Sequence, residues 1–214
     1  MARRDPGHPA LSRRPGELAQ WRHEPSAGAR VSVLVVTTFL AILVLVAGFG
    51  MLLTLTFVAM DRTRMLPGIM DGLRALVGPA SLWLAFGVVL TATLGSLYFS
   101  EVARFTPCVL CWYQRIAMYP LVIVLGVAAV RGDLSVRRYV APIAIIGAAI
   151  SIYHIGVERL PGLPSGSCSA AAPCDLIWVE RFGFITIPVM ALVGFLAVLT
   201  LLFAYPRPRE ETPA

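Results

Sequence analysis

The stretch FTPCVLCWYQR, residues 105 to 115, places two cysteines at the start of an apolar helical segment. In a helix that starts at this point, Cys108 and Cys111 are three residues apart and Arg115 follows one turn after Cys111. Side chains at these spacings share one helix face. The sequence therefore predicts a pair of thiols beside a cation.

The residues before the cysteine pair indicate where this helix begins. Thr106 and Pro107 are typical of an N-cap and a first turn, so we expect the helix to begin between them and Cys108. A cysteine at a helix N-terminus lies at the positive end of the helix dipole, and the nearby Arg115 adds a full charge. The Cys108 or Cys111 thiolate is therefore favoured, and the thiolate is the species that reacts.

The composition indicates which solvent surrounds that helix. Of the 214 residues, 57% are hydrophobic and 14% are charged, and the mean hydropathy is +0.77. These values predict an integral membrane protein, because soluble domains are far less apolar. The net charge is +6, and all of the Lys and Arg positions are arginine. The arginines gather in the N-terminal tail and the short connections, so we interpret them as topology determinants and not as a nucleic-acid-binding surface.

Apolar stretches long enough to span a bilayer predict an all-α membrane fold, since ~20 helical residues cross the hydrocarbon. They are residues 31–59, 80–100, 110–130, 139–157 and 183–205. We expect a four-helix membrane domain at 80–205, preceded by an additional hydrophobic helix at 31–59. Residues 1–30 are rich in arginine and proline and are expected to form a disordered tail, and 206–214 form a C-terminal tail.

The order of cysteines and helices predicts the topology. Cys108 and Cys111 precede one expected helix, whereas Cys168 and Cys174 follow the next one. Two crossings separate the pairs, so both lie on the same side of the membrane. The intervening connection, residues 131–138, is short and arginine-rich, which is typical of a cytoplasmic loop. Both cysteine pairs are therefore expected on the extracytoplasmic side.

The hydrophobic helix at 31–59 conflicts with the same charge rule. If the arginine-containing connection 60–79 is cytoplasmic, the arginine-rich N-terminal tail lies outside. Two interpretations stay open. Translation starts at an internal methionine, such as Met60 or Met65, and leaves a four-helix protein; or residues 31–59 form a fifth helix that is inserted despite its charges.

The four cysteines suggest two disulfides, which persist outside the cytoplasm. Three connectivities are possible, and pairing of neighbours requires the least of the structure. One alternative is a structural membrane protein with two stapling disulfides. A CxxC bond closes so small a loop that it is a poor staple and is better suited to exchange. A zinc site is disfavoured because the chain has no second CxxC, so no metal is predicted.

Arg115 would be costly about one turn inside a membrane helix. It either extends to the lipid headgroups or serves an anionic intermediate or the polar head of a cofactor. Its position on the cysteine face favours the second interpretation.

Three segments resemble the DsbB family of disulfide-bond formation proteins, nearest its BdbC-like branch. They are PCVLCWYQRIAMYPL (107–121), YHIGVE (153–158) and GFITIPVMAL (183–192). The likeness covers about residues 80–205, and it implies a thiol:quinone oxidoreductase in the bacterial inner membrane. Because the CxxC precedes the loop cysteines, the order differs from that of vitamin K epoxide reductase-like proteins.

The resemblance implies an electron path and its partners. A reduced extracytoplasmic thioredoxin-fold thiol oxidase, DsbA- or BdbD-like, would attack a Cys168–Cys174 disulfide at Cys168. Electrons would pass to a Cys108–Cys111 disulfide, and a membrane quinone, either ubiquinone or menaquinone, would reoxidise that pair.

The resemblance also assigns roles near the quinone. Cys111 would face the quinone, and Arg115 matches the family arginine that assists its binding. His154, near the outer end of its helix, is either an interfacial polar residue or a second contact to the quinone head. Gln114 replaces an acidic residue found in some relatives and is given no role.

Overall fold

A computed structural model describes residues 27–63, 68–160, 168 and 172–205 of the chain. The helices are α1 (Ala27–Arg62), α2 (Ile69–Val77), η1 (Gly78–Ala80), α3 (Ser81–Leu97), η2 (Tyr98–Val102), α4 (Val109–Arg131), η3 (Leu134–Val136), α5 (Arg137–Arg159) and α6 (Ile187–Ala204). The predicted tail at 206–214 and most of that at 1–30 lie outside the described residues.

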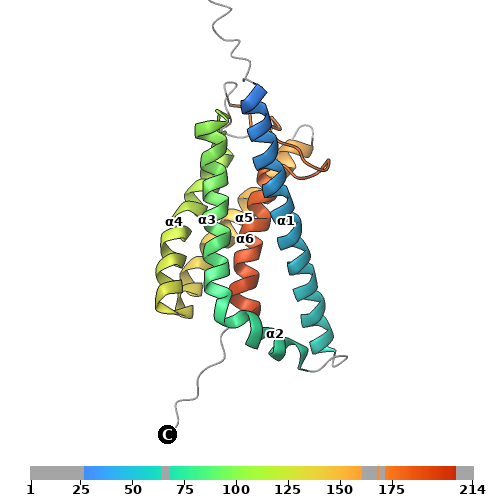
Figure 1. Cartoon of the computed structure of the whole chain (residues 1–214), viewed down its shortest axis with the longest axis vertical. Helices are drawn as coiled ribbons and strands as arrows, with labels where there is room; N and C mark the ends of the chain where they lie inside the picture. Colours follow the sequence, from blue (N-terminus) through green and yellow to red (C-terminus); the bar gives the residue numbers. More distant parts are fainter. Residues whose placement is uncertain (1–26, 64–67, 161–167, 169–171, 206–214) are drawn as a thin grey trace, which may run out of the picture.

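Four long helices form the bundle in which the core lies. Contacts join α3 to α4, α4 to α5, α5 to α6 and α6 back to α3, while α1 packs on α6. Figure 1 shows α1 along one side of the bundle and α2 at the end opposite the α4 start. The central apolar residues are Leu82, Val89, Leu121, Leu125, Val140, Ala144, Phe195 and Val198. Helices α5 and α6 approach closely, since a Cβ at Gly147 would overlap the Phe195 ring.

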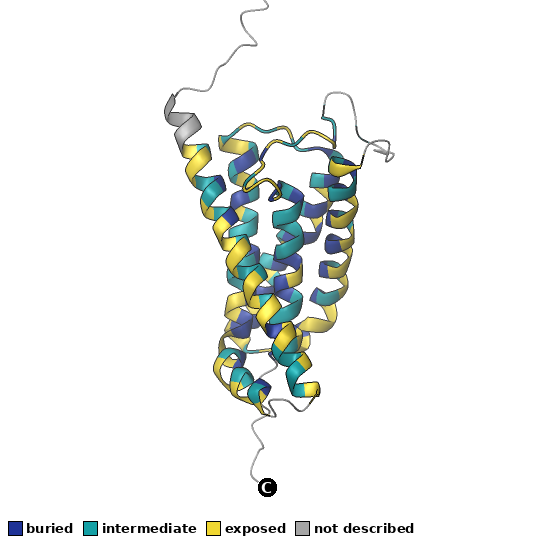
Figure 2. Cartoon of the chain, turned by 90° about the vertical axis from the view of Figure 1, so that its right-hand side faces the viewer, coloured by how far each residue is buried: buried dark blue, intermediate teal, exposed yellow. Residues whose placement is uncertain are grey.

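The outer surface of the bundle is apolar. Five helical segments among the described residues are long and apolar enough to cross a membrane. Exposed residues run along the outward faces of the helices, whereas buried residues face inward (Figure 2). Large exposed apolar side chains include Val46, Phe49, Leu55, Ile123, Val130 and Ile152. Such a surface suits hydrocarbon, so the prediction of an all-helical membrane bundle is confirmed.

Two boundaries differ from the sequence prediction. The last helix begins at Ile187 and not at residue 183, because Gly183 has a φ of 77° and Arg181 pairs with Ile185 in a turn. Glycine tolerates this left-handed conformation, which a helix cannot contain. The connection expected at 60–79 contains the short helix α2, whose amphipathic pattern the sequence prediction did not use.

Helix α1 is attached to the bundle near both of its ends. Arg181 donates hydrogen bonds to Thr37 Oγ1 from Nε at 3.0 Å and from Nη2 at 2.8 Å. Near the opposite end, Thr54 Oγ1 lies 2.7 Å from the Tyr205 hydroxyl. A translation start at Met60 stays a prediction, as does one at Met65, which lies outside the described residues.

Candidate functional site

Cys108 is itself the N-cap of α4. Its backbone is extended, with φ −74° and ψ 172°, and its Sγ accepts a hydrogen bond from the Cys111 N–H at 3.4 Å. The expected cap at Thr106 and Pro107 was therefore wrong, because the chain remains extended through Cys108 before the helix begins. The sulfur takes the place of the usual capping oxygen and lies directly at the positive end of the helix.

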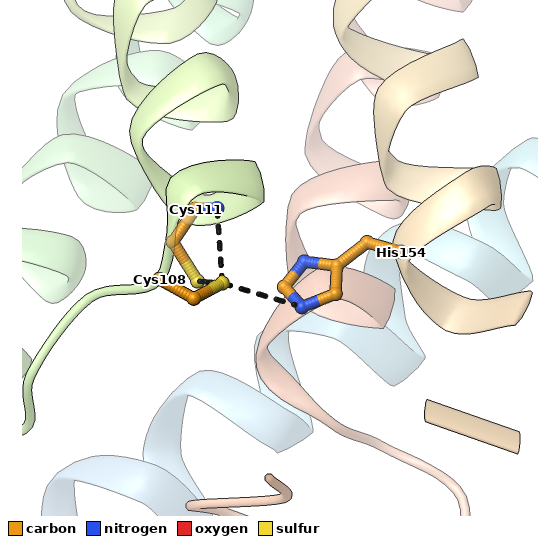
Figure 3. A group of neighbouring side chains, drawn as sticks. All are labelled: Cys108, Cys111 and His154. Atoms are coloured by element: carbon orange, nitrogen blue, oxygen red, sulfur yellow. Dashed lines mark hydrogen bonds between the residues drawn. The ribbon is translucent and has the colours of Figure 1, made fainter. Parts of the chain in front are cut away.

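The cysteine pair faces a histidine from α5. The Sγ atoms of Cys108 and Cys111 lie 3.3 Å apart, and His154 Nε2 lies 3.7 Å from Cys108 Sγ. Figure 3 shows the imidazole directed from α5 towards Cys108 at the start of α4. The same Nε2 lies 3.2 Å from the Cys174 carbonyl oxygen, which can only accept. Nε2 therefore carries a hydrogen when this bond forms.

The structure brings all four cysteines together. Cys168 and Cys174 form a disulfide, whereas Cys108 and Cys111 are free thiols. Cys108 and Cys174 belong to one buried cluster, against which Cys111 and Cys168 pack. The two pairs thus lie at the same end of the bundle, as expected from the two helices that separate them in the sequence. The Cys108–Cys111 bond stays a prediction.

The surroundings of Cys108 favour its thiolate. Its pKa is lowered to about 4, first by the hydrogen bond with the Cys111 thiol and then by His154 and the Cys111 backbone N–H, while burial opposes the shift. A thiolate is therefore present at neutral pH, as disulfide exchange requires.

Cys111 lies between two cavities. A small one is lined by Cys108, Cys111, His154 and Glu158 among others. A second, of about 690 Å³, is lined by Cys111, Arg115 and the helices α1, α3 and α6. The large cavity is the size of a typical small-molecule site. Cys111 lines both cavities, whereas His154 lines only the small one among the described residues.

Arg115 is held at the wall of the large cavity by α3. Its Nε donates to Ser96 Oγ at 2.9 Å and its Nη2 donates to the Ser96 carbonyl at 3.1 Å. The guanidinium carbon lies 5.3 Å from the centre of the Trp112 ring. These contacts hold a fixed positive charge one turn below Cys111. His154 is not among the described residues that line this cavity, so its predicted quinone contact gains no support from this placement.

The sequence does not predict several residues of the site. Phe105 stacks on Trp178 with ring centres 5.0 Å apart, and both line the large cavity. Gln114, which was given no role, is buried and donates to Ser151 Oγ at 3.0 Å. Glu158 accepts from Thr186 Oγ1 at 2.7 Å. Helical spacing offered a signal for Glu158, which follows His154 by four residues, and for Gln114, which follows Cys111 by three.

Cys108, Cys111 and His154 also have the ligand types of a metal site. Their ligand atoms lie within 4.8 Å of one another. They supply three of the four ligands that a structural zinc site uses. The expectation that the protein binds no metal stays a prediction.

Several known proteins have sequences similar to this chain. Residues 79–172 match the family of disulfide bond formation protein DsbB. The chain is 52% identical over 120 residues to disulfide bond formation protein C of Bacillus subtilis. The aligned region spans 55% of this chain and 86% of the relative. It is 43% identical over 144 residues to a probable disulfide formation protein of Deinococcus radiodurans, and this aligned region spans 62% of the chain and 92% of that relative. No solved structure matches the chain. These similarities show that the chain belongs to the DsbB family of disulfide bond formation proteins, which implies a disulfide oxidoreductase.

Proposed function

We propose that the protein reoxidises an extracytoplasmic thioredoxin-fold thiol oxidase and passes the electrons to a membrane quinone. The observation that carries this proposal is the position of Cys111. It packs with the other three cysteines and also lines the large apolar cavity beside Arg115. A dithiol in this position can exchange with a disulfide on one side and reduce an apolar acceptor on the other.

The residues of the large cavity fit a quinone. Its wall is mostly apolar, and Arg115 supplies a cation next to Cys111. Ser96 takes two hydrogen bonds from the guanidinium, so further N–H donors remain for a carbonyl oxygen. A quinone bound there, ubiquinone or menaquinone, would accept two electrons and two protons and become a quinol.

The two cysteine pairs act in sequence. A thiolate of the reduced partner attacks Cys168 Sγ, which breaks the Cys168–Cys174 bond and releases Cys174 as a thiolate. The second thiolate of the partner then displaces Cys168, so that the partner leaves oxidised. One of the two reduced cysteines attacks the Cys108–Cys111 disulfide, and exchange restores the outer bond and reduces the inner pair. Oxidation of Cys108 and Cys111 then gives up two electrons and the two thiol protons.

His154 stabilises the thiolate during this exchange. Its Nε2–H lies within reach of both Cys108 Sγ and the Cys174 carbonyl oxygen. A donor shared by the two pairs favours negative charge on Cys108 when the inner disulfide is opened, and it orients Cys108 toward the Cys174 segment. His154 thus acts at the junction of the pairs.

The cysteine end of the bundle faces the extracytoplasmic side of a bacterial inner membrane. Arginines of the α4–α5 connection lie at the opposite end, where they mark the cytoplasmic side; they are Arg131, Arg137 and Arg138. At the cysteine end, Arg159 pairs with Glu180 and Arg181 bonds to Thr37, so two arginines there have structural partners. A secreted thiol oxidase would meet the Cys168–Cys174 disulfide on this side.

The test is quinone-dependent oxidation of a reduced thioredoxin-fold protein by the purified full-length chain. Cys111→Ser is expected to abolish turnover, because it removes the sulfur that lies between the two cavities. Retention of the Cys168–Cys174 disulfide, measured by mass spectrometry, controls for folding. Turnover that survives in Cys111→Ser would contradict the relay. If the wild type gives no quinone-dependent turnover at all, two structural disulfides are the better account.

A further inference from the structure

Helix α1 provides one wall of the large cavity. Lining residues of α1 extend from Leu40 to Thr54, a distance of ~21 Å along a helix. The facing walls come from α3 and α6, with Gly87 on α3 and Ala197 on α6 among the lining residues. The match to the DsbB family begins at residue 79, after α1 and α2. The α1 wall of the cavity therefore lies outside the part of the chain that matches the family model.

Polar contacts hold α1 in place on either side of this cavity. Thr37 accepts from Arg181 at the cysteine end, and Thr54 bonds to Tyr205 at the other. At the cysteine end α1 also comes close to α3, where a Cβ on Gly95 would lie 2.9 Å from Leu40 Cδ1. Between these contacts no Cβ added to Gly50 or Gly87 would meet another atom within 4 Å. Helix α1 is thus held at Thr37, Leu40 and Thr54, and it is separated from α3 in the region of Gly50 and Gly87.

We propose that α1 forms a binding groove for the isoprenoid tail of the quinone. The inference rests on the proposed function, since the tail is attached to the head that Cys111 reduces. The groove is continuous with the Cys111 and Arg115 end of the cavity. Arg115 is the one charged side chain among the described lining residues, so the rest of the cavity suits hydrocarbon. Its length along α1 accommodates several isoprene units.

A matched pair of glycines in α1 tests this groove. Gly50 lines the cavity and Gly48, two residues earlier, does not; an added Cβ has open space at both positions. Gly50→Leu fills the groove, whereas Gly48→Leu makes the same change outside it. Leucine is a better helix former than glycine, so both variants keep the helix. Gly87→Leu fills the same groove from α3.

The measurement compares the KM for a long-tailed quinone with that for a tail-less analogue, in full-length protein reconstituted in a bilayer. Gly50→Leu and Gly87→Leu are expected to raise the ratio of the two KM values about tenfold, because one methylene too many or too few in an apolar pocket already changes discrimination by roughly 10–200-fold. Gly48→Leu is expected to keep the wild-type ratio. Quinone extracted from the purified protein should fall in the same two variants.

The outcomes separate this inference from the proposed function. If all three variants turn over the long-tailed quinone as the wild type does, the groove holds only bilayer lipid, and the inference fails while the relay stands. An equal loss with Gly48→Leu also overturns it, because the effect then belongs to α1 packing and not to the groove. If the wild type reduces neither quinone, the proposed function fails and the inference fails with it.

Discussion

Cys108 combines two roles that are usually given to different residues. As the N-cap it accepts the Cys111 N–H, and as a thiol it lies 3.7 Å from His154 Nε2. Both contacts place positive charge or hydrogen-bond donors around the sulfur, and both favour its anion. The capping bond to Cys108 therefore also contributes to its activation, beside the Cys111 thiol and His154. The sequence predicts an activated cysteine here, but it predicts the cap at Thr106, because sulfur is not among the usual capping groups.

The lowered pKa of Cys108 predicts a thiolate that persists in mild acid. In reduced protein carrying Cys168→Ser and Cys174→Ser, the thiolate absorbance is expected to stay constant from about pH 8 to about pH 5 and to fall as the pH drops through about 4. The sign follows from stabilisation of the charged form, so the proton binds only at low pH. Cys111→Ala removes the largest cause and should raise the pKa. An absorbance that appears only near the ordinary thiol pKa of ~8.5 would contradict the assignment.

Helix α4 connects the cluster of four cysteines to the large cavity. Its N-cap is Cys108, its first turn carries Cys111 and its second turn carries Arg115, which α3 holds through Ser96. Helical spacing alone predicted that Cys111 and Arg115 share a face, and both line the cavity. The Phe105–Trp178 stack could not be predicted in this way. It joins segments far apart in the sequence, and local periodicity contains no information about such contacts.

Arg115→Lys tests whether binding of the quinone depends on the two-point contact between Arg115 and Ser96, and not only on the positive charge. Lysine keeps the positive charge but loses the planar fork that bonds Ser96 at two points. The KM for quinone is expected to rise about tenfold, since hydrogen bonds from charged groups contribute roughly 1.5–3 kcal/mol and ~1.4 kcal/mol is tenfold. Exchange between partner and protein, followed in a single turnover without quinone, should keep its rate. Arg131→Lys, at the far end of α4, is the matched control.

At the scale of the whole molecule, the sequence predicted the elements better than their arrangement. Apolar runs long enough to span a bilayer correspond to five helices, among the described residues, that are long and apolar enough to cross a membrane. The number of helices between the two cysteine pairs predicted that both pairs lie at one end, as they do. The arrangement of α1 depends on side-chain contacts such as Thr37–Arg181 and Thr54–Tyr205. No periodic pattern in either segment identifies these partners, so the cavity between α1 and α3 could not be predicted.

The distribution of charge predicts how the molecule is oriented in the membrane. In protein with all four cysteines replaced by serine, Glu101→Cys introduces a thiol at the cysteine end and Ser135→Cys introduces one in the α4–α5 connection; both positions are exposed. A membrane-impermeant maleimide should label Glu101→Cys in intact cells, because this end is expected outside. Ser135→Cys should react only after permeabilisation, since the neighbouring arginines favour the cytoplasm. Labelling of Ser135→Cys in intact cells would invert the topology, and a secreted thiol partner could then not reach the Cys168–Cys174 disulfide.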